Sequence, residues 1–313
     1  MQTTHSTAPW FVLGTGAIGT LWATKFLKQE IPCVLLHKNQ PRSTGNSEDC
    51  LSKQLRVLDL NAEQSSYCTD SFNILAPGKI NKLLLCTKSY QSIVALTPLI
   101  PFIAEDAVVL ILQNGMGQHQ LIAELLPKRQ IIIATTTEGA VVNSPLCITH
   151  TGAGDSFFGL DNPLNSSIDK ATVECLSSIG MQLQDNIRAL LWHKLTINCA
   201  INPLTALFNC RNGALLSNRR YYAQLQKICD EIDSVCSHSG FATIGGSSLH
   251  SVASVAQRTA NNFSSMQQDI VNKRKTEIAF INGFLQQQAA KSALHLPLNS
   301  QLLRDIEVLE SQY

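Results

Sequence analysis

The chain has 313 residues, of which 44% are hydrophobic and only 15% charged, and its formal net charge is +1. This balance excludes a disordered chain and gives no overall field that favours nucleic acid or an anionic membrane surface. No apolar stretch approaches the roughly 20 residues that span a bilayer, and the polar segment Met1–Pro9 lacks the pattern of a signal peptide. We therefore expect a cytoplasmic protein without nucleic-acid or membrane partners.

Ten cysteines are spread along the chain, and no two of them form a C-x-x-C pair. A zinc ribbon or thioredoxin-type motif is therefore not expected, and no other ligand cluster indicates a metal site. Cys33 and Cys86 lie in apolar runs, where a free thiol packs like a small hydrophobic side chain. The cysteines are interpreted as reduced thiols.

The first half of the chain alternates short apolar strands with helical patterns. The expected strands are Trp10–Leu13, Pro32–Leu36, Leu83–Cys86, Ala107–Leu112 and Ile131–Ala134, and the expected helices are Ala17–Gln29 and a stretch from Ser89. Continuous apolar strands separated by helices favour a parallel sheet covered on both faces. We also expect edge strands around Leu55–Leu60 and a hairpin or edge pair within Ile148–Leu160.

Long helical periodicities replace the strand patterns after about Asp185. The expected helices are Ile187–Phe208, Ser217–His238, Leu249–Asn261, Thr276–Ser292 and Asn299–Glu310. The sequence thus predicts an α/β protein with a Rossmann-like, doubly wound parallel sheet in residues 1–185 and an all-α domain in residues 186–313. Apolar faces on the C-terminal helices would pack within the chain or against a second copy, so a homodimer stays open.

The motif Gly14-Thr15-Gly16-Ala17-Ile18-Gly19 has the G-x-G-x-x-G spacing of a dinucleotide-binding turn. It follows the first expected strand and opens the first expected helix. In such a turn the first glycine allows the tight bend, the second lets the backbone approach a pyrophosphate, and the third lets helix and strand pack closely. The helix N–H groups then face the anion. The alternative is a glycine-rich turn without a ligand.

The end of the second expected strand bears on the choice of cofactor. An NAD site usually has an acidic residue there, which binds the ribose 2′-hydroxyl. This chain reads Leu36-His37-Lys38, with no carboxylate before Glu48. A cation suits a 2′-phosphate, so NADP is favoured over NAD; the alternative is a solvent-exposed Lys38.

Two further loops follow expected strands, at the sheet edge where ligands of open α/β sheets bind. Lys88 follows one strand, and Asn114 opens the sequence Asn-Gly-Met-Gly after another. Asn114 can donate and accept hydrogen bonds at once, as a group between a nicotinamide and a substrate needs to. An Asn-Gly pair is also a common simple turn.

A polar stripe follows one face of the first C-terminal helix. Lys194, Asn198 and Asn202 recur at intervals of four residues in an otherwise apolar segment. Burying a Lys and two amides is costly without partners, so function is one explanation for the stripe, and a solvent-facing helix surface is the other. A desolvated Lys has a lowered pKa, which suits proton donation. Pro203 is expected to open the helix at Asn202 and free a carbonyl.

These segments resemble the ketopantoate reductase family, whose members reduce ketopantoate with NADPH in pantothenate biosynthesis. The resemblance covers almost the whole chain, and its most specific parts are the run Lys194 to Ala206, which reads Lys-x-x-x-Asn-x-x-x-Asn-Pro-Leu-Thr-Ala, and Ser264-Ser265-Met266 with Asp269. Thr276-Glu277-Ile278 follows in the family's order. Lys38 stands where the family usually has Arg, which is expected to soften the preference for NADP.

The resemblance implies a role for each matching residue. The cofactor would contact Gly14, Thr15, Gly16, Ala17, Ile18, Gly19, Lys38, Lys88, Asn114, Ala140 and Glu277. The substrate would contact Asn114, Lys194, Asn198, Asn202, Asn212, Asn262 and Ser265. Lys194 would be the proton donor, and Glu277 would help to order the site.

The implied reaction is hydride transfer from NADPH to the C2 ketone of 2-dehydropantoate, with Lys194 protonating the oxygen. Two alternatives remain open at this point. One is a reductase of a different 2-oxo acid, and the other is a non-enzymatic NADP-binding sensor, which would need the glycine turn but not Lys194.

Overall fold

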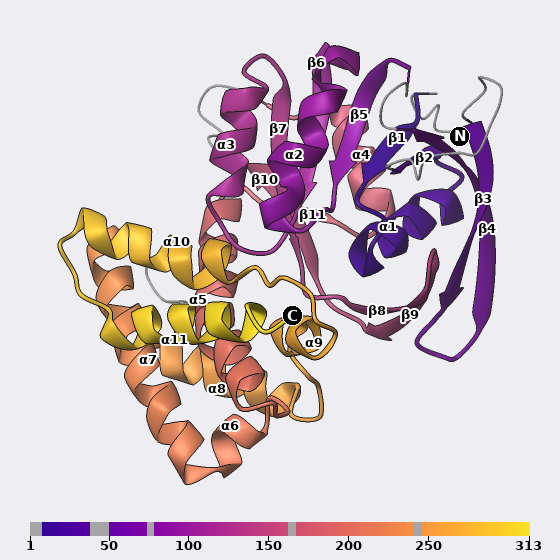
Figure 1. The fold of residues 1–313 in the computed structure, drawn as a ribbon. Coiled ribbons are helices and arrows are strands. Elements are labelled where there is room, and N and C mark those ends of the chain that lie inside the picture. Colours follow the sequence, from indigo (N-terminus) through magenta and orange to yellow (C-terminus); the bar gives the residue numbers. More distant parts are fainter. Residues whose placement is uncertain (1–7, 38–49, 74–77, 162–166, 241–245) are drawn as a thin grey trace. The chain divides into compact units, whose positions relative to one another are not determined.

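The computed structural model describes residues 8–37, 50–73, 78–161, 167–240 and 246–313. It divides into two compact units (Figure 1). The sheet unit comprises Met1–Gln113 and Gln118–Ile187, and the helical unit comprises Asn114–Gly117 and Arg188–Tyr313. The predicted fold class, a largely parallel α/β sheet followed by a helical region, is confirmed. The short segment 114–117 groups with the helices although strand β6 leads into it.

Within the described residues, eleven strands form one sheet in the order β11-β10-β7-β6-β5-β1-β2-β4-β3-β9-β8. The strands are β1 (Trp10–Leu13), β2 (Cys33–His37), β3 (Cys50–Leu58), β4 (Gln64–Asn73), β5 (Ile80–Leu85), β6 (Ile103–Leu112), β7 (Gln130–Thr136), β8 (Gly139–Ser144), β9 (Cys147–Gly152), β10 (Ser156–Leu160) and β11 (Gln182–Leu183). From β7 through β6, β5, β1 and β2 to β4 all neighbours run parallel. The carboxyl ends of these strands therefore share one edge of the sheet.

The expectation of a hairpin or edge pair within Ile148–Leu160 is wrong, because β9 and β10 do not pair with each other. Strand β9 pairs with β8 and β3, whereas β10 pairs with β7 and β11. The segment between β9 and β10 does not turn back but passes close to the backbone of Thr137. A Cβ on Gly154 would lie only 2.5 Å from the carbonyl carbon of Thr137. The edge hairpin is formed by β8 and β9, one strand earlier in the chain.

Helices occur in both units, between the strands of the sheet unit and throughout the helical unit. The sheet unit contains α1 (Ala17–Lys28), α2 (Ser92–Leu96), α3 (Gln118–Leu125), α4 (Lys170–Ser178) and the short 3₁₀ turns Ser89–Gln91 and Thr97–Phe102. The helical unit contains α5 (Ile187–Leu207, whose first residue groups with the sheet unit), α6 (Ala214–Ser217), α7 (Arg219–Ser239), α8 (Ser248–Arg258), α9 (Ser265–Val271), α10 (Ile278–Lys291) and α11 (Pro297–Glu310). Among the described residues, no helix combines the length and the apolar character that a membrane span requires.

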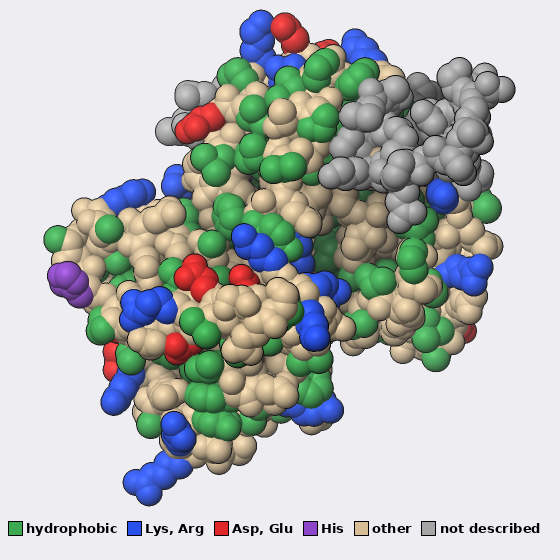
Figure 2. Space-filling view, in the orientation of Figure 1, with side chains coloured by type: hydrophobic (Ala, Val, Ile, Leu, Met, Phe, Trp, Pro, Cys, Tyr) green, Lys and Arg blue, Asp and Glu red, His purple; other side chains and the backbone are tan. Residues whose placement is uncertain are grey.

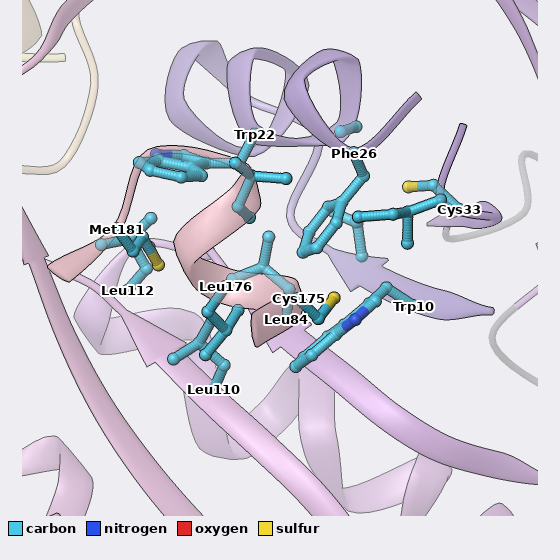
Figure 3. Close-up of a cluster of buried hydrophobic side chains, with 14 of the residues drawn as sticks. Trp10, Trp22, Phe26, Cys33, Leu84, Leu110, Leu112, Cys175, Leu176 and Met181 are labelled. Carbon is cyan, nitrogen blue, oxygen red and sulfur yellow. The ribbon is translucent and has the colours of Figure 1, made fainter. Parts of the chain in front are cut away.

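The main core of the sheet unit lies between one face of the sheet and helices α1 and α4 (Figure 3). Trp10 from β1 stacks on Phe26 from α1 with ring centroids 5.3 Å apart. Cys175 and Leu176 of α4 complete this layer. Burial of two large aromatic rings fixes α1 against β1, and this contact sets the position of the glycine turn that joins them.

The surface agrees with the composition. On the face shown in Figure 2, acidic and basic side chains lie scattered among polar and hydrophobic ones. The nine cysteines whose side chains the structure describes are all free thiols, and Cys33, Cys175, Cys199, Cys229 and Cys236 are buried.

Candidate active site

The glycine turn connects β1 to α1 as its spacing predicts. Gly14 has a φ of 102°, and a Cβ there would lie 2.4 Å from the backbone nitrogen of Thr87. A Cβ on Gly19 would lie 1.8 Å from the carbonyl oxygen of Gly14. A Cβ on Gly16, in contrast, would have no atom of the described structure within 4 Å. Close backbone packing thus excludes a side chain at Gly14 and at Gly19, whereas Gly16 faces open space.

This geometry fits the pyrophosphate of a dinucleotide. Gly16 is the N-cap of α1, and no side chain among the described residues caps the helix there. The first turn, which includes Ala17 and Ile18, has no carboxylate. Uncapped N–H groups and the positive end of the helix dipole favour an anion at this point. The residues present are therefore suited to the phosphates of NAD or NADP.

The segment after β5 lies against the glycine turn. The backbone N–H of Cys86 donates to the carbonyl of Leu13, at 2.8 Å, and Lys88 follows at the start of the next 3₁₀ turn, half-buried. Gln113 has no role predicted from the sequence, yet its amide Nε2 donates to the Thr87 carbonyl at 2.7 Å and to Ser92 Oγ at 2.7 Å. Gln113 thereby holds the loop that presents Lys88.

Two other predicted cofactor residues have different outcomes. Lys38 lies outside the described residues. Ala140 lies on β8, pairs with His150 on β9, and packs against the small cluster that contains Leu21 of α1. The side chain of the neighbouring Glu138 is buried and forms an ion pair with Lys25, and its carboxylate lies 3.0 Å from His150 Nε2. These contacts tie the β8–β9 hairpin to α1.

Helix α5 carries the polar stripe. Lys194 and Asn198 are half-buried, and Asn202 is buried. None of the three is fully exposed, as a solvent-facing stripe would be. Burial without full enclosure allows such groups to contact a ligand while the helix stays packed in its unit.

The expectation that Pro203 opens the helix at Asn202 is wrong, because α5 continues through Pro203 to Leu207. The carbonyl that lacks a helical donor belongs to Cys199, four residues before the proline. The side-chain amide of Asn282 on α10 donates to this carbonyl at 2.9 Å. A second helix thus supplies the missing hydrogen bond, and the stripe keeps its helical spacing.

Glu277 and Asn114 come together within the helical unit. Glu277 is 5% exposed and is the N-cap of α10. The Asn114 Nδ2 atom donates to Glu277 Oε2 at 3.3 Å. The loop of Asn114 is fixed next to it, since the Met116 N–H donates to the Phe280 carbonyl at 2.9 Å. Gly115 has a φ of 80°, and a Cβ there would lie 2.5 Å from the Phe280 oxygen, so this approach requires glycine.

Lys194 has an altered acidity. Burial lowers the pKa of Lys194 from 10.5 to about 8, and the negative charge of Glu277 acts in the opposite direction. A lysine with a pKa near 8 is protonated at neutral pH and still releases its proton readily. This is the property expected of a general acid.

The remaining predicted substrate residues lie where α6, α8 and α9 begin or end. The Asn212 N–H donates to the Asn262 carbonyl at 3.0 Å, and Asn212 Oδ1 is buried without a hydrogen-bond partner among the described residues. Ser264 caps α9 by accepting from the Gln267 N–H at 3.1 Å. Ser265, the first residue of α9, is exposed. The cap role falls to Ser264 and leaves the Ser265 hydroxyl at the surface.

Comparisons with known proteins match nearly the whole chain. Residues 10–162 match the family model described as ketopantoate reductase PanE/ApbA, and residues 186–310 match its C-terminal model. The 2-dehydropantoate 2-reductase of Vibrio cholerae is 33% identical, over 96% of this chain and 98% of that protein. The enzyme of the same name from Yersinia pestis is 32% identical, over 96% of this chain and 95% of that protein.

Solved structures share the fold at lower identity. A PanE/ApbA family ketopantoate reductase from Ralstonia eutropha JMP134 has a TM-score of 0.84 at 21% identity, covering 97% of this chain and 99% of that one. D-mandelate dehydrogenase in a ternary structure with NADH and anilino(oxo)acetate has a TM-score of 0.84 at 20% identity, with the same coverage. A dimeric ketopantoate reductase from Staphylococcus aureus has a TM-score of 0.77 at 18% identity, covering 97% and 99% of the two chains. By sequence and by fold, the chain belongs to the ketopantoate reductase family of oxidoreductases.

Proposed function

We propose that this protein reduces 2-dehydropantoate to (R)-pantoate with NADPH, a step that belongs to pantothenate and coenzyme A biosynthesis. The observation that supports this most strongly is the pKa of Lys194, which burial lowers to about 8 while the carboxylate of Glu277 acts to raise it. Relatives that bear the name 2-dehydropantoate 2-reductase support the choice of substrate.

The chemistry of the residues gives each a task. NADPH, when bound at the glycine turn, supplies the hydride for the C2 ketone. Lys194 stabilises the negative charge that develops on the ketone oxygen and then protonates it, so that an O–H bond forms as an N–H bond of the ammonium breaks. Glu277, which accepts a hydrogen bond from Asn114, orients that amide and keeps Lys194 protonated.

The polar side chains of the helical unit would bind and orient the substrate. We assign Asn198, Asn202, Asn212, Asn262 and Ser265 to the substrate carboxylate and hydroxyl groups, whose hydrogen bonds would hold C2 in position. On the cofactor side we assign Gly14, Thr15, Gly16, Ala17, Ile18, Gly19, Lys38, Lys88, Asn114 and Ala140.

The direct test is NADPH oxidation with ketopantoate by the wild-type protein and by Lys194→Ala. We expect turnover by the wild type and a loss of roughly 100-fold or more in kcat for the variant, the size typical of a lost general acid. Parallel assays with NADH measure the preference for the phosphorylated cofactor. Absence of turnover by folded wild-type protein, while it still binds NADPH, would instead favour a sensor.

A reductase of a different 2-oxo acid is the second candidate, since D-mandelate dehydrogenase has the same fold. A panel of 2-oxo acids ranked by kcat/KM distinguishes the two. If the second candidate is correct, another 2-oxo acid should have a higher kcat/KM than ketopantoate. We also infer a homodimer from the dimeric relative of the same fold. Sedimentation of the purified protein tests this assembly.

A further inference from the structure

A small cavity of about 190 Å³ lies within the sheet unit, beside the glycine turn. Its apolar walls come from Leu35 on β2 and from Pro145 and Leu146 in the turn between β8 and β9. Typical sites for a whole drug-sized ligand measure roughly 300–1,000 Å³. The cavity is therefore suited to one part of a dinucleotide.

The polar lining shows which part fits. Thr15 belongs to the glycine turn itself, and His37 stands at the end of β2. In dinucleotide-binding folds this strand end lies next to the 2′ position of the adenosine ribose. Ser71 and Lys53 complete the polar side, and no carboxylate is among the described residues that line the cavity. A lining with a lysine and no acid favours a phosphate over a hydroxyl.

Lys53 has an unusual place on its strand. In β3 the side chains of Leu55 and Val57 are buried, whereas Gln54 and Arg56 are exposed. The two-residue period of a strand puts Lys53 on the buried face with Leu55 and Val57. A cation on a core-facing position is costly unless it meets an anion or solvent, and the cavity at Lys53 provides room for an anion.

We propose that Lys53 recognises the 2′-phosphate of the cofactor and so determines specificity for NADP, an assignment that rests on the NADPH-dependent function proposed above. The sequence favours Lys38 for this role, and Lys38 lies outside the described residues. Lys53 lies on β3, 15 positions later in the chain. The register sets Lys53 opposite Thr69 on β4, level with Cys33 where β2 begins, but its side chain lines the same cavity as His37 at the other end of β2.

The test compares two small nucleotides that differ in the 2′-phosphate, so it needs no substrate and no turnover. Adenosine 2′,5′-bisphosphate and 5′-AMP are titrated calorimetrically into the wild type, Lys53→Met and Lys53→Arg. Arg56→Met is the matched control, because it removes one positive charge from the exposed face of the same strand. Its melting temperature and that of Lys53→Met show whether both variants remain folded.

We expect the wild type to prefer the bisphosphate by roughly tenfold or more, as a charge-assisted hydrogen bond allows. Lys53→Met should lose most of this ratio while binding 5′-AMP as before. Lys53→Arg should keep most of the ratio, and Arg56→Met should keep all of it. A wild-type ratio in Lys53→Met, or an equal loss in Arg56→Met, would overturn the assignment.

The steady-state assay separates this result from the proposed function. Wild-type protein that reduces ketopantoate with NADPH, while Lys53→Met keeps the nucleotide preference, would leave the function standing and remove Lys53 from it. Wild-type protein that binds neither nucleotide and reduces no 2-oxo acid would contradict both.

Discussion

Asn282 replaces the backbone donor that Pro203 lacks. The Cys199 carbonyl, four residues before the proline, accepts from Asn282 Nδ2 at 2.9 Å. The same amide donates to Asn299 Oδ1 at 2.9 Å, and the Asn299 amide donates to Glu231 at 2.8 Å. Cys199, Asn282 and Asn299 are buried and Glu231 is half-buried, so each hydrogen bond is costly to remove. The chain of bonds fixes α5, which carries Lys194, against α10, which begins next to Glu277.

Replacing Asn282 by Leu should therefore destabilise the protein. The Cys199 carbonyl and the Asn299 side-chain oxygen would stay buried without this donor, at a cost of roughly 2–4 kcal/mol in the free energy of unfolding. Urea denaturation measures the change. Asn272→Leu, which removes an exposed amide at the end of α9, should change the free energy of unfolding by less than about 0.5 kcal/mol.

The proline offers a specific rescue. Pro203→Ala restores a backbone N–H that can donate to the Cys199 carbonyl. In the Asn282→Leu background this second change should recover part of the lost stability, which gives a coupling of about 1 kcal/mol in a double-mutant cycle. Strictly additive effects would show that Asn282 does not compensate for the proline.

The pH dependence of the reaction should reflect Lys194. Its ammonium form is the proton donor, and its pKa is about 8, so kcat/KM for ketopantoate should fall as the pH rises through about 8. Glu277→Gln removes a negative charge that raises this pKa, and it should move the descending limb to lower pH. A limb that begins only above pH 10 would contradict the assignment.

Lys194→Met should stabilise the protein while abolishing reduction. The pKa of Lys194 falls from 10.5 to about 8 on folding, so the unfolded state holds more protons between these values. Wild-type stability therefore rises with pH across this window. The gain in the free energy of unfolding from Lys194→Met, roughly 1–3 kcal/mol at neutral pH, should become smaller above pH 8. Thermal melts of both proteins at pH 7 and pH 9.5 measure it, and a less stable Lys194→Met would refute the expectation.

The glycine turn allows a matched pair of substitutions. Gly19→Ala places a Cβ 1.8 Å from the Gly14 oxygen, so the backbone must shift and the melting temperature should drop. Gly16→Ala meets no atom of the described structure within 4 Å and should leave the melting temperature nearly unchanged. It should nevertheless weaken NADPH binding by roughly tenfold or more, because the methyl group blocks the approach of the pyrophosphate. Full-strength binding by Gly16→Ala would exclude this turn as the phosphate site.

Glu138 should matter for stability and not for the reaction. Its side chain is 5% exposed and pairs with Lys25, so Glu138→Gln should cost roughly 3 kcal/mol by leaving the partly buried Lys25 charge without its counter-ion. The exposed pair of Lys128 and Glu105 is the control. Glu105→Gln should cost less than about 1 kcal/mol, because solvent screens that pair. Chemical denaturation of both variants compares the two, and equal effects would contradict the prediction.

Local patterns were sufficient to predict the elements around the site. The apolar run Trp10–Leu13 matches β1 residue for residue, and the periodicity from Ile187 predicts α5 to within one residue. The pairing of β9 and β10 was not predictable in the same way. It depends on which distant strand each segment meets, and the tight passage at Gly154 carries no local mark in the sequence.

The candidate site shows the same division between local and tertiary information. The four-residue spacing of the stripe is visible in the sequence, since it follows from helix geometry. The contact of Asn114 with Glu277 joins segments 163 positions apart, and the role of Asn282 emerges only once α10 lies next to Cys199. Lys53 was missed because strand alternation is informative only when the buried face is known.

The position of the segment 114–117 has a consequence for hydrogen exchange. Its chain neighbours on both sides belong to the sheet unit, yet its contacts belong to the helices. The Met116 amide is bonded to the Phe280 carbonyl, so deuterium would replace its proton when this bond to α10 opens. The uptake rate at Met116 should thus match that of the early turns of α10 and differ from that of its chain neighbours in the sheet unit.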